Sequence, residues 1–360
     1  MIKITLAKNA LSGPLSVLSK VINSKGIFPI LDNFLFEVKE GKVKVTTSDN
    51  ETYLSSELTT TECEGEGTIC IPAKSFLEGI SNIPEQPITI AVDDLNISVA
   101  YQNGEFNIVG ADGAEYPRPQ AIEGKEVVFN GKDLAGGINS TLYAVATDEL
   151  RPILCGVYLD MRESEVIFVS TDGHRLVSCH KQVNTDGMPS FVLPKKPAAL
   201  VKAFAENEVE VKIMSDGKTA QFIGAGYKLT CRLVDGRFPN WETVIPKDNP
   251  FSMTLDRMSF LAAVKRVSVF AASSGIIRLD ISASEMVVKG ENPDFSVSAK
   301  ETMPCQFNGE MAIGFKGANL VEMLSNLSGA EVTMKLSDPT KAGVIESDGI
   351  VMILMPMVLM

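Results

Sequence analysis

Histidine and tryptophan are scarce in this 360-residue chain, and its cysteines are scattered. There is one tryptophan, and the only histidines are His174 and His180. The six cysteines form no C-x-x-C pair, which favours free thiols in a reducing compartment over a disulfide framework. Together with Cys179, the histidines could indicate a metal site. However, no second cluster supplies the remaining ligands at a recognisable spacing, so we expect no metal.

Long apolar runs are missing as well. The first ten residues, MIKITLAKNA, contain no apolar core of a signal peptide. The longest apolar run, Gly349–Met360, is too short to span a bilayer and is broken by Pro356. Charged residues (22%) and hydrophobic residues (45%) are in globular proportion, and the length allows two or three domains. We therefore expect a soluble cytoplasmic protein that does not contact the membrane.

The usual signatures of catalysis are also missing. The sequence has no phosphate-binding glycine loop and no G-x-S-x-G turn. Ser170, Asp172 and His174 could indicate a catalytic triad, but residues so close together along one strand end do not easily adopt the relay geometry. The sequence thus predicts a protein that is not an enzyme and needs no cofactor. The alternative is a hydrolase built on the 170–174 loop, in which His174→Ala would abolish turnover.

An internal repeat is the main feature that is present. The segments Pro29–Glu51 and Pro152–Val177 both begin with P-I-L and continue through two apolar strands joined by a charged turn. They end in S-D-N and T-D-G, and the two prolines are 123 positions apart. A more diverged third copy follows Ser252. The period predicts three tandem similar domains, at 1–124, 125–247 and 248–360.

Each copy has the same order of predicted elements: strand, helix, hairpin, strands, helix and strands. Leucines at 11, 15 and 18 mark one face of the first helix, and the second helices are expected at 75–83, 197–205 and 318–327. This order predicts an α+β fold in which two helices pack on an antiparallel sheet in every domain.

Charge is unevenly distributed along the chain, whose net charge is −12. Residues 1–31, 187–205 and 257–279 contain lysine or arginine but neither aspartate nor glutamate. These three windows overlap the expected helices, so the pattern predicts a positive, helical side that attracts phosphates. The alternative is that they are ordinary solvated helix faces.

Three motifs make the pattern specific: TDGHRL at 171–176, LVDGRFPNW at 233–241 and MPM at 355–357. In a threefold-repeated chain of this length they resemble the bacterial sliding clamp, the beta subunit of the replicative DNA polymerase III holoenzyme. The resemblance implies a DNA clamp fold and a head-to-tail homodimer that forms a six-domain ring. It also implies a processivity factor that encircles double-stranded DNA without sequence specificity. The implied partners are the replicative polymerase subunit, the clamp loader and other proteins with a clamp-binding motif, including repair proteins.

The resemblance also assigns residues. The DNA-facing lysines would be Lys25, Lys74, Lys195 and Lys196, for which a solvated surface position is the alternative. Val269 and Phe270 would lie at the dimer interface, with core packing as the alternative. A partner-peptide pocket would be lined by Leu154, Thr171, Gly173, His174, Arg175, Leu176, Pro239, Val244, Met355, Pro356, Met357 and Leu359.

Two departures from the family pattern bear on these assignments. Val358 stands where many members carry arginine, so the polar rim of the pocket is expected to differ. Pro152 and Ile153 stand where some members have aromatic residues that touch DNA. For the methionine-rich tail, a buried edge strand is the alternative to a pocket wall.

Overall fold

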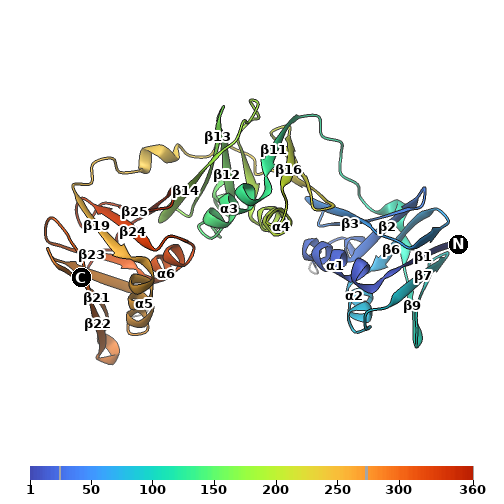
Figure 1. Cartoon of the computed structure of the whole chain (residues 1–360), viewed down its shortest axis with the longest axis horizontal. Helices are drawn as coiled ribbons and strands as arrows, with labels where there is room; N and C mark the ends of the chain where they lie inside the picture. Colours follow the sequence, from blue (N-terminus) through green and yellow to red (C-terminus); the bar gives the residue numbers. More distant parts are fainter. Residues whose placement is uncertain (24–25, 272–274, 360) are drawn as a thin grey trace. The chain divides into compact units, whose positions relative to one another are not determined.

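The computed structural model describes residues 1–23, 26–271 and 275–359, which fold into helices and four antiparallel sheets (Figure 1). The chain divides into two compact units, each made of two stretches of sequence. Unit 1 comprises Met1–Ala135 and Ala199–Leu233, and unit 2 comprises Gly136–Ala198 and Val234–Met360. Each sheet lies within one unit, so the two units are described separately.

Unit 1 contains a five-stranded sheet in the order β5-β1-β7-β8-β9 and a nine-stranded sheet in the order β10-β6-β2-β3-β4-β18-β17-β16-β11. The strands of the smaller sheet are β1 (Ile2–Ala7), β5 (Glu62–Glu64), β7 (Pro87–Asp93), β8 (Asn96–Tyr101) and β9 (Gly104–Val109). Those of the larger sheet are β2 (Asn33–Lys39), β3 (Lys42–Ser48), β4 (Thr52–Leu58), β6 (Gly67–Pro72), β10 (Ala111–Asp112), β11 (Lys125–Asn130), β16 (Glu210–Ser215), β17 (Thr219–Gly224) and β18 (Tyr227–Arg232).

Unit 2 has the same plan, with an eight-stranded sheet in the order β15-β12-β13-β14-β26-β25-β24-β19 and a four-stranded sheet in the order β22-β21-β20-β23. The larger sheet contains β12 (Gly156–Met161), β13 (Glu165–Thr171), β14 (Arg175–Gln182), β15 (Phe191–Pro194), β19 (Phe251–Asp256), β24 (Glu331–Leu336), β25 (Gly343–Ser347) and β26 (Ile350–Leu354). The smaller contains β20 (Ile276–Ile281), β21 (Glu285–Asn292), β22 (Val297–Pro304) and β23 (Met311–Lys316).

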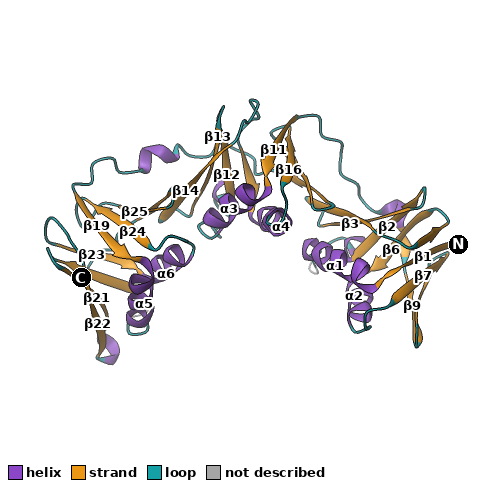
Figure 2. Cartoon of the chain, in the orientation of Figure 1, coloured by secondary structure: helices purple, strands orange, loops and turns teal. Residues whose placement is uncertain are grey.

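Each sequence repeat contributes two α-helices, as the pattern predicted. They are α1 (Lys8–Leu18) and α2 (Ala73–Ser81), α3 (Gly131–Leu142) and α4 (Lys195–Ala205), and α5 (Arg257–Ser268) and α6 (Gly317–Ser325). Helices α1 and α2 pack together in unit 1, as do α5 and α6 in unit 2, and Figure 2 shows each pair on one face of its strands. The second helices begin one or two residues before the predicted starts at 75, 197 and 318. The α+β fold class is therefore confirmed.

The alternation of side chains along the strands explains why the helices pack on one face of the sheet. In β2, Phe34 and Phe36 are fully buried toward the helices, and the ring of Phe36 meets that of Phe76 in α2 edge-on at 5.9 Å. The intervening residue Leu35 points to the opposite face of the sheet. There it joins a separate cluster that contains Leu31, Cys70 and Tyr116.

Two strand pairings join successive repeats. At the first junction, β4 of the first repeat pairs with β18 of the second, with Thr52 opposite Cys231. At the second junction, β14 pairs with β26 of the third repeat, with Arg175 opposite Leu354. Because these sheets run from one repeat into the next, the compact units do not coincide with the repeats. The domain boundaries at 124 and 247 therefore stay a prediction.

Candidate functional site

The second junction carries an apolar pocket of about 240 Å³ within unit 2. It lies where the ends of β14 and β26 meet the 3-10 helices η4 (Pro152–Leu154) and η5 (Trp241–Val244). Its lining residues are Leu154, Thr171, Gly173, His174, Arg175, Leu176, Phe238, Pro239, Asn240, Trp241, Val244, Ile353 and Met355. The first wall is the turn between β13 and β14, the second is the segment after Val234, and the third is the end of β26.

The β13–β14 turn is held by one carboxylate. Asp172 Oδ1 accepts hydrogen bonds from the backbone N–H groups of His174, at 2.9 Å, and Arg175, at 3.0 Å. Gly173 has φ +90°, a conformation that favours glycine. The carbonyl of His174 accepts the N–H of Met355 at 2.9 Å. The T-D-G-H-R sequence thus fixes the turn and ties it to the C-terminal tail.

Arg175 is buried, with 8% of its surface exposed, and anchors the floor of the pocket. Its guanidinium donates to Asp172 Oδ2 at 3.1 Å, to Glu322 Oε2 of α6 at 2.7 Å and to the carbonyl of Tyr143 at 2.9 Å. It also lies 5.3 Å from the centre of the Tyr143 ring. Burial raises the pKa of Tyr143, although the Arg175 charge acts in the opposite direction. The hydrogen bonds of Arg175 therefore hold β14 against α6.

Aromatic residues build the opposite wall. The rings of Phe238 and Tyr158 are stacked with centres 4.5 Å apart. Trp241 is buried, and its indole N–H donates to Asp160 Oδ2 at 3.3 Å. The same carboxylate oxygen accepts Arg162 Nη2 at 2.9 Å. Because the polar edge of Trp241 is satisfied within the fold, its apolar face is left for the pocket.

The tail beyond β26 continues away from the pocket. Pro356, Met357 and Leu359, which the resemblance placed in the pocket, do not line it. Met357 instead donates its N–H to the carbonyl of Gly314 in β23 at 2.8 Å. A side chain at Gly314 would meet Leu359 Cδ2 at 2.7 Å, so this glycine allows the tail to lie against β23. Met355 and Met357 are 45% and 37% exposed, which excludes a fully buried edge strand.

Sequence reasoning missed Phe238, Asn240, Trp241 and Ile353 as lining residues. Three of them are within the quoted LVDGRFPNW motif, next to the predicted Pro239, and Ile353 is two positions before Met355. The LVDGRFPNW motif was therefore the sequence feature from which three of these lining residues could have been predicted. The side chains that face the pocket could not be chosen without the 3-10 turn that begins at Trp241.

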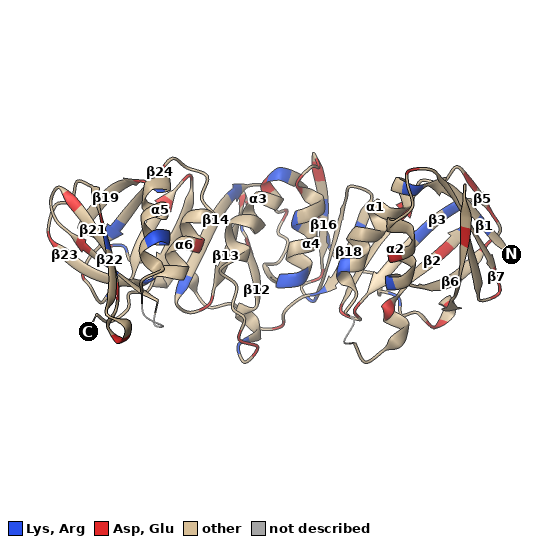
Figure 3. Cartoon of the chain, turned by 90° about the horizontal axis from the view of Figure 1, so that it is seen from below, with Lys and Arg blue, Asp and Glu red and all other residues tan. Residues whose placement is uncertain are grey.

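Three of the four predicted DNA-facing lysines lie in the first turn of a helix. Lys74 in α2 and Lys195 in α4 are exposed and make no ion pair among the described residues, and Lys196 is half-buried. Lys25 lies outside the described residues. Figure 3 shows lysine and arginine on α4 and α5.

The third basic window is less positive than its sequence indicated. Arg257 donates to the carbonyls of Leu324 and Gly329, so it serves the end of α6. Arg266 forms two 2.6 Å hydrogen bonds with Glu301, and Arg278 pairs with Asp280 at 2.7 Å. The Arg266 hydrogen bonds hold the pKa of Glu301 below its usual range. Two of the four cations in this window are thus paired with carboxylates and a third is bound to backbone carbonyls, which no count of charges could reveal.

Val269 and Phe270 follow the end of α5 and are 77% and 41% exposed. These exposures contradict the core-packing alternative. Helix α5 packs against β22, an unpaired edge of the four-stranded sheet, and β9 is an unpaired edge of the five-stranded sheet in unit 1. Each unit therefore offers an open strand, and the one in unit 2 has exposed apolar side chains close by.

The loop at 170–174 does not assemble a catalytic triad. Ser170 is fully buried, and its hydroxyl has no partner among the described residues. The Asp172 carboxylate is held by Arg175 and by two backbone N–H groups, not by the imidazole of His174. His180 pairs with Glu165 at 3.0 Å, whereas Cys179 is buried. Within the described ranges, no three histidine, cysteine, aspartate or glutamate residues gather as metal ligands.

The described helices include none that is long and apolar enough to cross a bilayer.

Comparison with known proteins covers almost the whole chain. Three family models match in order: DNA polymerase III beta subunit, N-terminal domain at 2–120, central domain at 129–240 and C-terminal domain at 242–358. The beta sliding clamp of Bacillus subtilis (strain 168) is 26% identical, with 98% of this chain and 99% of the relative covered. That of Vibrio cholerae serotype O1 is 25% identical with the same coverage.

Solved structures have the same fold. The Pseudomonas aeruginosa sliding clamp bound to griselimycin superposes with a TM-score of 0.95 at 24% identity, covering 99% of this chain and 100% of that one. The Bartonella birtlesii clamp bound to griselimycin gives a TM-score of 0.95 at 25% identity with the same coverage.

Proposed function

Because the chain belongs to the family of the bacterial beta sliding clamp, the DNA polymerase III beta subunit, we propose that two copies close into a ring around duplex DNA. Members of this family are non-catalytic processivity factors, and their partners are the polymerase and DNA. The observation that carries the ring proposal is the charge distribution. The exposed lysines Lys74 and Lys195 stand at helix starts of a chain whose net charge is −12. We place this function in the cytoplasm.

The lysines would meet the DNA backbone, not the bases. Lys74, Lys195 and Lys196, with Lys25, are the residues proposed for this role. Lysine binds phosphate as a point charge, so such contacts are independent of sequence and weaken as salt rises. The rest of the chain has a net negative charge, which would repel DNA. Retention on DNA would come from the closed ring, which permits sliding.

The ring would close through the two open strands. We propose that β22 of one protomer meets β9 of its partner, with Val269 and Phe270 covered in the contact. This contact joins two different surfaces, and it closes after two copies if the rotation between them is a half turn. Six similar domains would then surround the DNA.

The pocket at the second junction is proposed to hold short peptides of the polymerase subunit, the clamp loader and other proteins with a clamp-binding motif. Its lining is mostly apolar, and its polar atoms are largely satisfied by the fold. Met355 is exposed at the rim, and a methionine side chain adapts to ligands of different shape. Val358 is 84% exposed and provides no charge to the rim.

The solution mass tests ring closure. One chain is 38.8 kDa, so light scattering after size exclusion is expected to give about twice that mass. Phe270→Asp should shift the mass toward that of one chain, because a charge would be buried without a partner. Val209→Asp is the matched control, since Val209 is 78% exposed and lies on a loop outside the proposed contact. A monomeric wild-type protein would contradict the proposal.

Peptide binding tests the pocket separately. Removing residues 355–360, or introducing Val244→Asp, should abolish binding of a peptide from the cognate polymerase subunit. Both changes alter the pocket wall, whereas the proposed ring contacts remain. The solution mass of each variant serves as its control. Unchanged affinity in both variants would show that the peptide binds elsewhere.

A further inference from the structure

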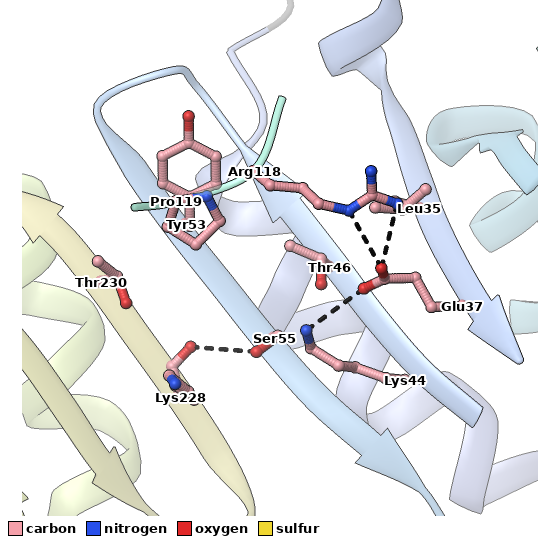
Figure 4. Close-up of a pocket in the computed structure, with 10 residues that line it drawn as sticks. All are labelled: Leu35, Glu37, Lys44, Thr46, Tyr53, Ser55, Arg118, Pro119, Lys228 and Thr230. Carbon is pink, nitrogen blue, oxygen red and sulfur yellow. Dashed lines mark hydrogen bonds and ion pairs between the residues drawn. The ribbon is translucent and has the colours of Figure 1, made fainter. Parts of the chain in front are cut away.

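The first junction also carries a pocket, and its chemistry differs from that of the second. It lies in unit 1 on the sheet face opposite α1 and α2, beneath the segment that follows Tyr116 (Figure 4). We propose that it binds a small oxyanion of the phosphate class. The lining residues are Leu35, Glu37, Lys44, Thr46, Tyr53, Ser55, Arg118, Pro119, Lys228 and Thr230.

Strand register gathers these side chains. Leu35, Thr46, Ser55 and Lys228 are direct neighbours across β2, β3, β4 and β18. Such a row places its side chains on one face of the sheet. The floor of the pocket is therefore built by two successive repeats, and the β4–β18 pairing is needed to complete it.

Three cations converge on the pocket, and one carboxylate balances only part of their charge. Glu37 Oε1 accepts both Nε and Nη2 of Arg118, at 3.3 and 3.2 Å, and its Oε2 accepts Lys44 Nζ at 3.3 Å. Figure 4 shows Glu37 between these two cations. Lys228 makes no ion pair with any described residue. An anion entering the pocket would therefore meet one unpaired ammonium group and two partly neutralised cations.

A buried hydroxyl at the pocket floor lacks a partner. Thr46 is 5% exposed, and its Oγ1 forms no hydrogen bond among the described residues. A buried polar atom without a partner is costly, and the pocket is where a partner could come from. Thr230 Oγ1 accepts from Gln221 Nε2 at 3.2 Å, which leaves its own hydrogen to donate. Two hydroxyl donors beside three cations match the several acceptor oxygens of a phosphate group.

The space fits a small ligand. The pocket measures about 180 Å³, roughly six times the volume of one water in the liquid. An adjoining pocket of about 470 Å³ shares Tyr53, Arg118, Pro119 and Thr230 with it. A phosphate group in the smaller pocket could thus carry a substituent into the larger one. Helix α2, which carries Lys74, packs on the other face of this sheet, so this inference does not rest on the ring.

Titration of inorganic phosphate into the full-length protein, at constant ionic strength with chloride, tests the site by calorimetry. We expect saturable binding. Lys228→Met should weaken it about tenfold through loss of the unpaired charge. Thr46→Val, which keeps the shape of the side chain, should weaken it about threefold to tenfold.

Lys212→Met is the matched control. Lys212 lies on β16 of the same sheet, pairs with Glu126 at 3.2 Å and does not line the pocket, so its loss should leave the dissociation constant unchanged. The proposal is overturned if phosphate shows no saturable binding. It is also overturned if the control variant weakens binding as much as Lys228→Met.

Discussion

The two junctions share a backbone and differ in a few side chains. Each begins with a turn in which one aspartate accepts two backbone N–H groups. Asp49 Oδ1 accepts from Glu51 at 3.2 Å and from Thr52 at 2.7 Å, as Asp172 Oδ1 does from the equivalent residues 123 positions later. The second turn residue, directly after the aspartate, has positive φ in both, +78° at Asn50 and +90° at Gly173. The strand after each turn then pairs with the next repeat.

The difference begins at the fourth turn residue. At the first junction it is Thr52, a small buried side chain. At the second it is Arg175, which reaches Glu322 and the carbonyl of Tyr143. The segments that cover the two junctions also differ in their side chains. Arg118 and Pro119 cover the first junction, whereas the aromatic residues Phe238 and Trp241 cover the second. The same backbone scaffold thus carries a pocket lined by cations at the first junction and an apolar pocket at the second. The repeat determines where each pocket lies, and we propose that its side chains determine which ligand it binds.

The largest effect is expected from the fourth turn residue. Arg175→Ala removes a buried cation and leaves Asp172 Oδ2 and the Tyr143 carbonyl without the donor they share, which should cost about 3 kcal/mol of unfolding free energy. Thr52→Ala, its counterpart, should cost about 1 kcal/mol. Urea unfolding of both variants measures the difference. Equal costs would show that Arg175 does not stabilise the second junction.

A smaller effect is expected from the second turn residue. Gly173→Ala places a side chain at φ +90°, so we expect a loss of about 1–2 kcal/mol. Asn50→Gly at the equivalent position relieves the same conformation and should change stability by no more than about 0.5 kcal/mol. The same unfolding experiment applies. A neutral Gly173→Ala variant would argue that the turn relaxes away from the shared geometry.

The smallest effect at neutral pH concerns two tyrosines, the buried Tyr116 near the first junction and the half-buried Tyr143 near the second. Burial raises the pKa of Tyr116 and of Tyr143 above the ordinary value. A raised folded-state pKa gives stability that is complete below pH about 10. It is lost as pH rises toward the folded pKa, by up to about 1.4 kcal/mol per pH unit for each group.

Replacing either tyrosine with phenylalanine should remove its share of this alkaline loss, measured as the urea midpoint between pH 8 and about pH 11. Tyr143→Phe also removes a 3.5 Å contact to Met352 Sδ, so a slight cost at pH 8 is expected for that variant alone. If the alkaline loss persists in both variants, other groups cause it.

The repeat, the two helices per domain and the T-D-G-H-R turn were predictable because they depend on local pattern and period. Nine of the residues predicted for the peptide pocket, from Leu154 to Met355, line one pocket in the structure, and their role in peptide binding stays a prediction. The joining of β4 to β18 was not predictable, since it pairs residues far apart in sequence with ordinary strand composition. Nor were the hydrogen bonds of Arg257 to backbone carbonyls and the pairing of Arg266 with Glu301, because these partners are in other elements.

The direct test of the central claim, a ring held on DNA by topology, is retention on DNA of two forms. The protein is loaded by the cognate clamp loader onto nicked circular DNA, and half of the sample is then cut once by a restriction enzyme. The ring account predicts that protein remains with the circular DNA through gel filtration and is lost from the linear DNA. Equal retention on both forms would contradict the account.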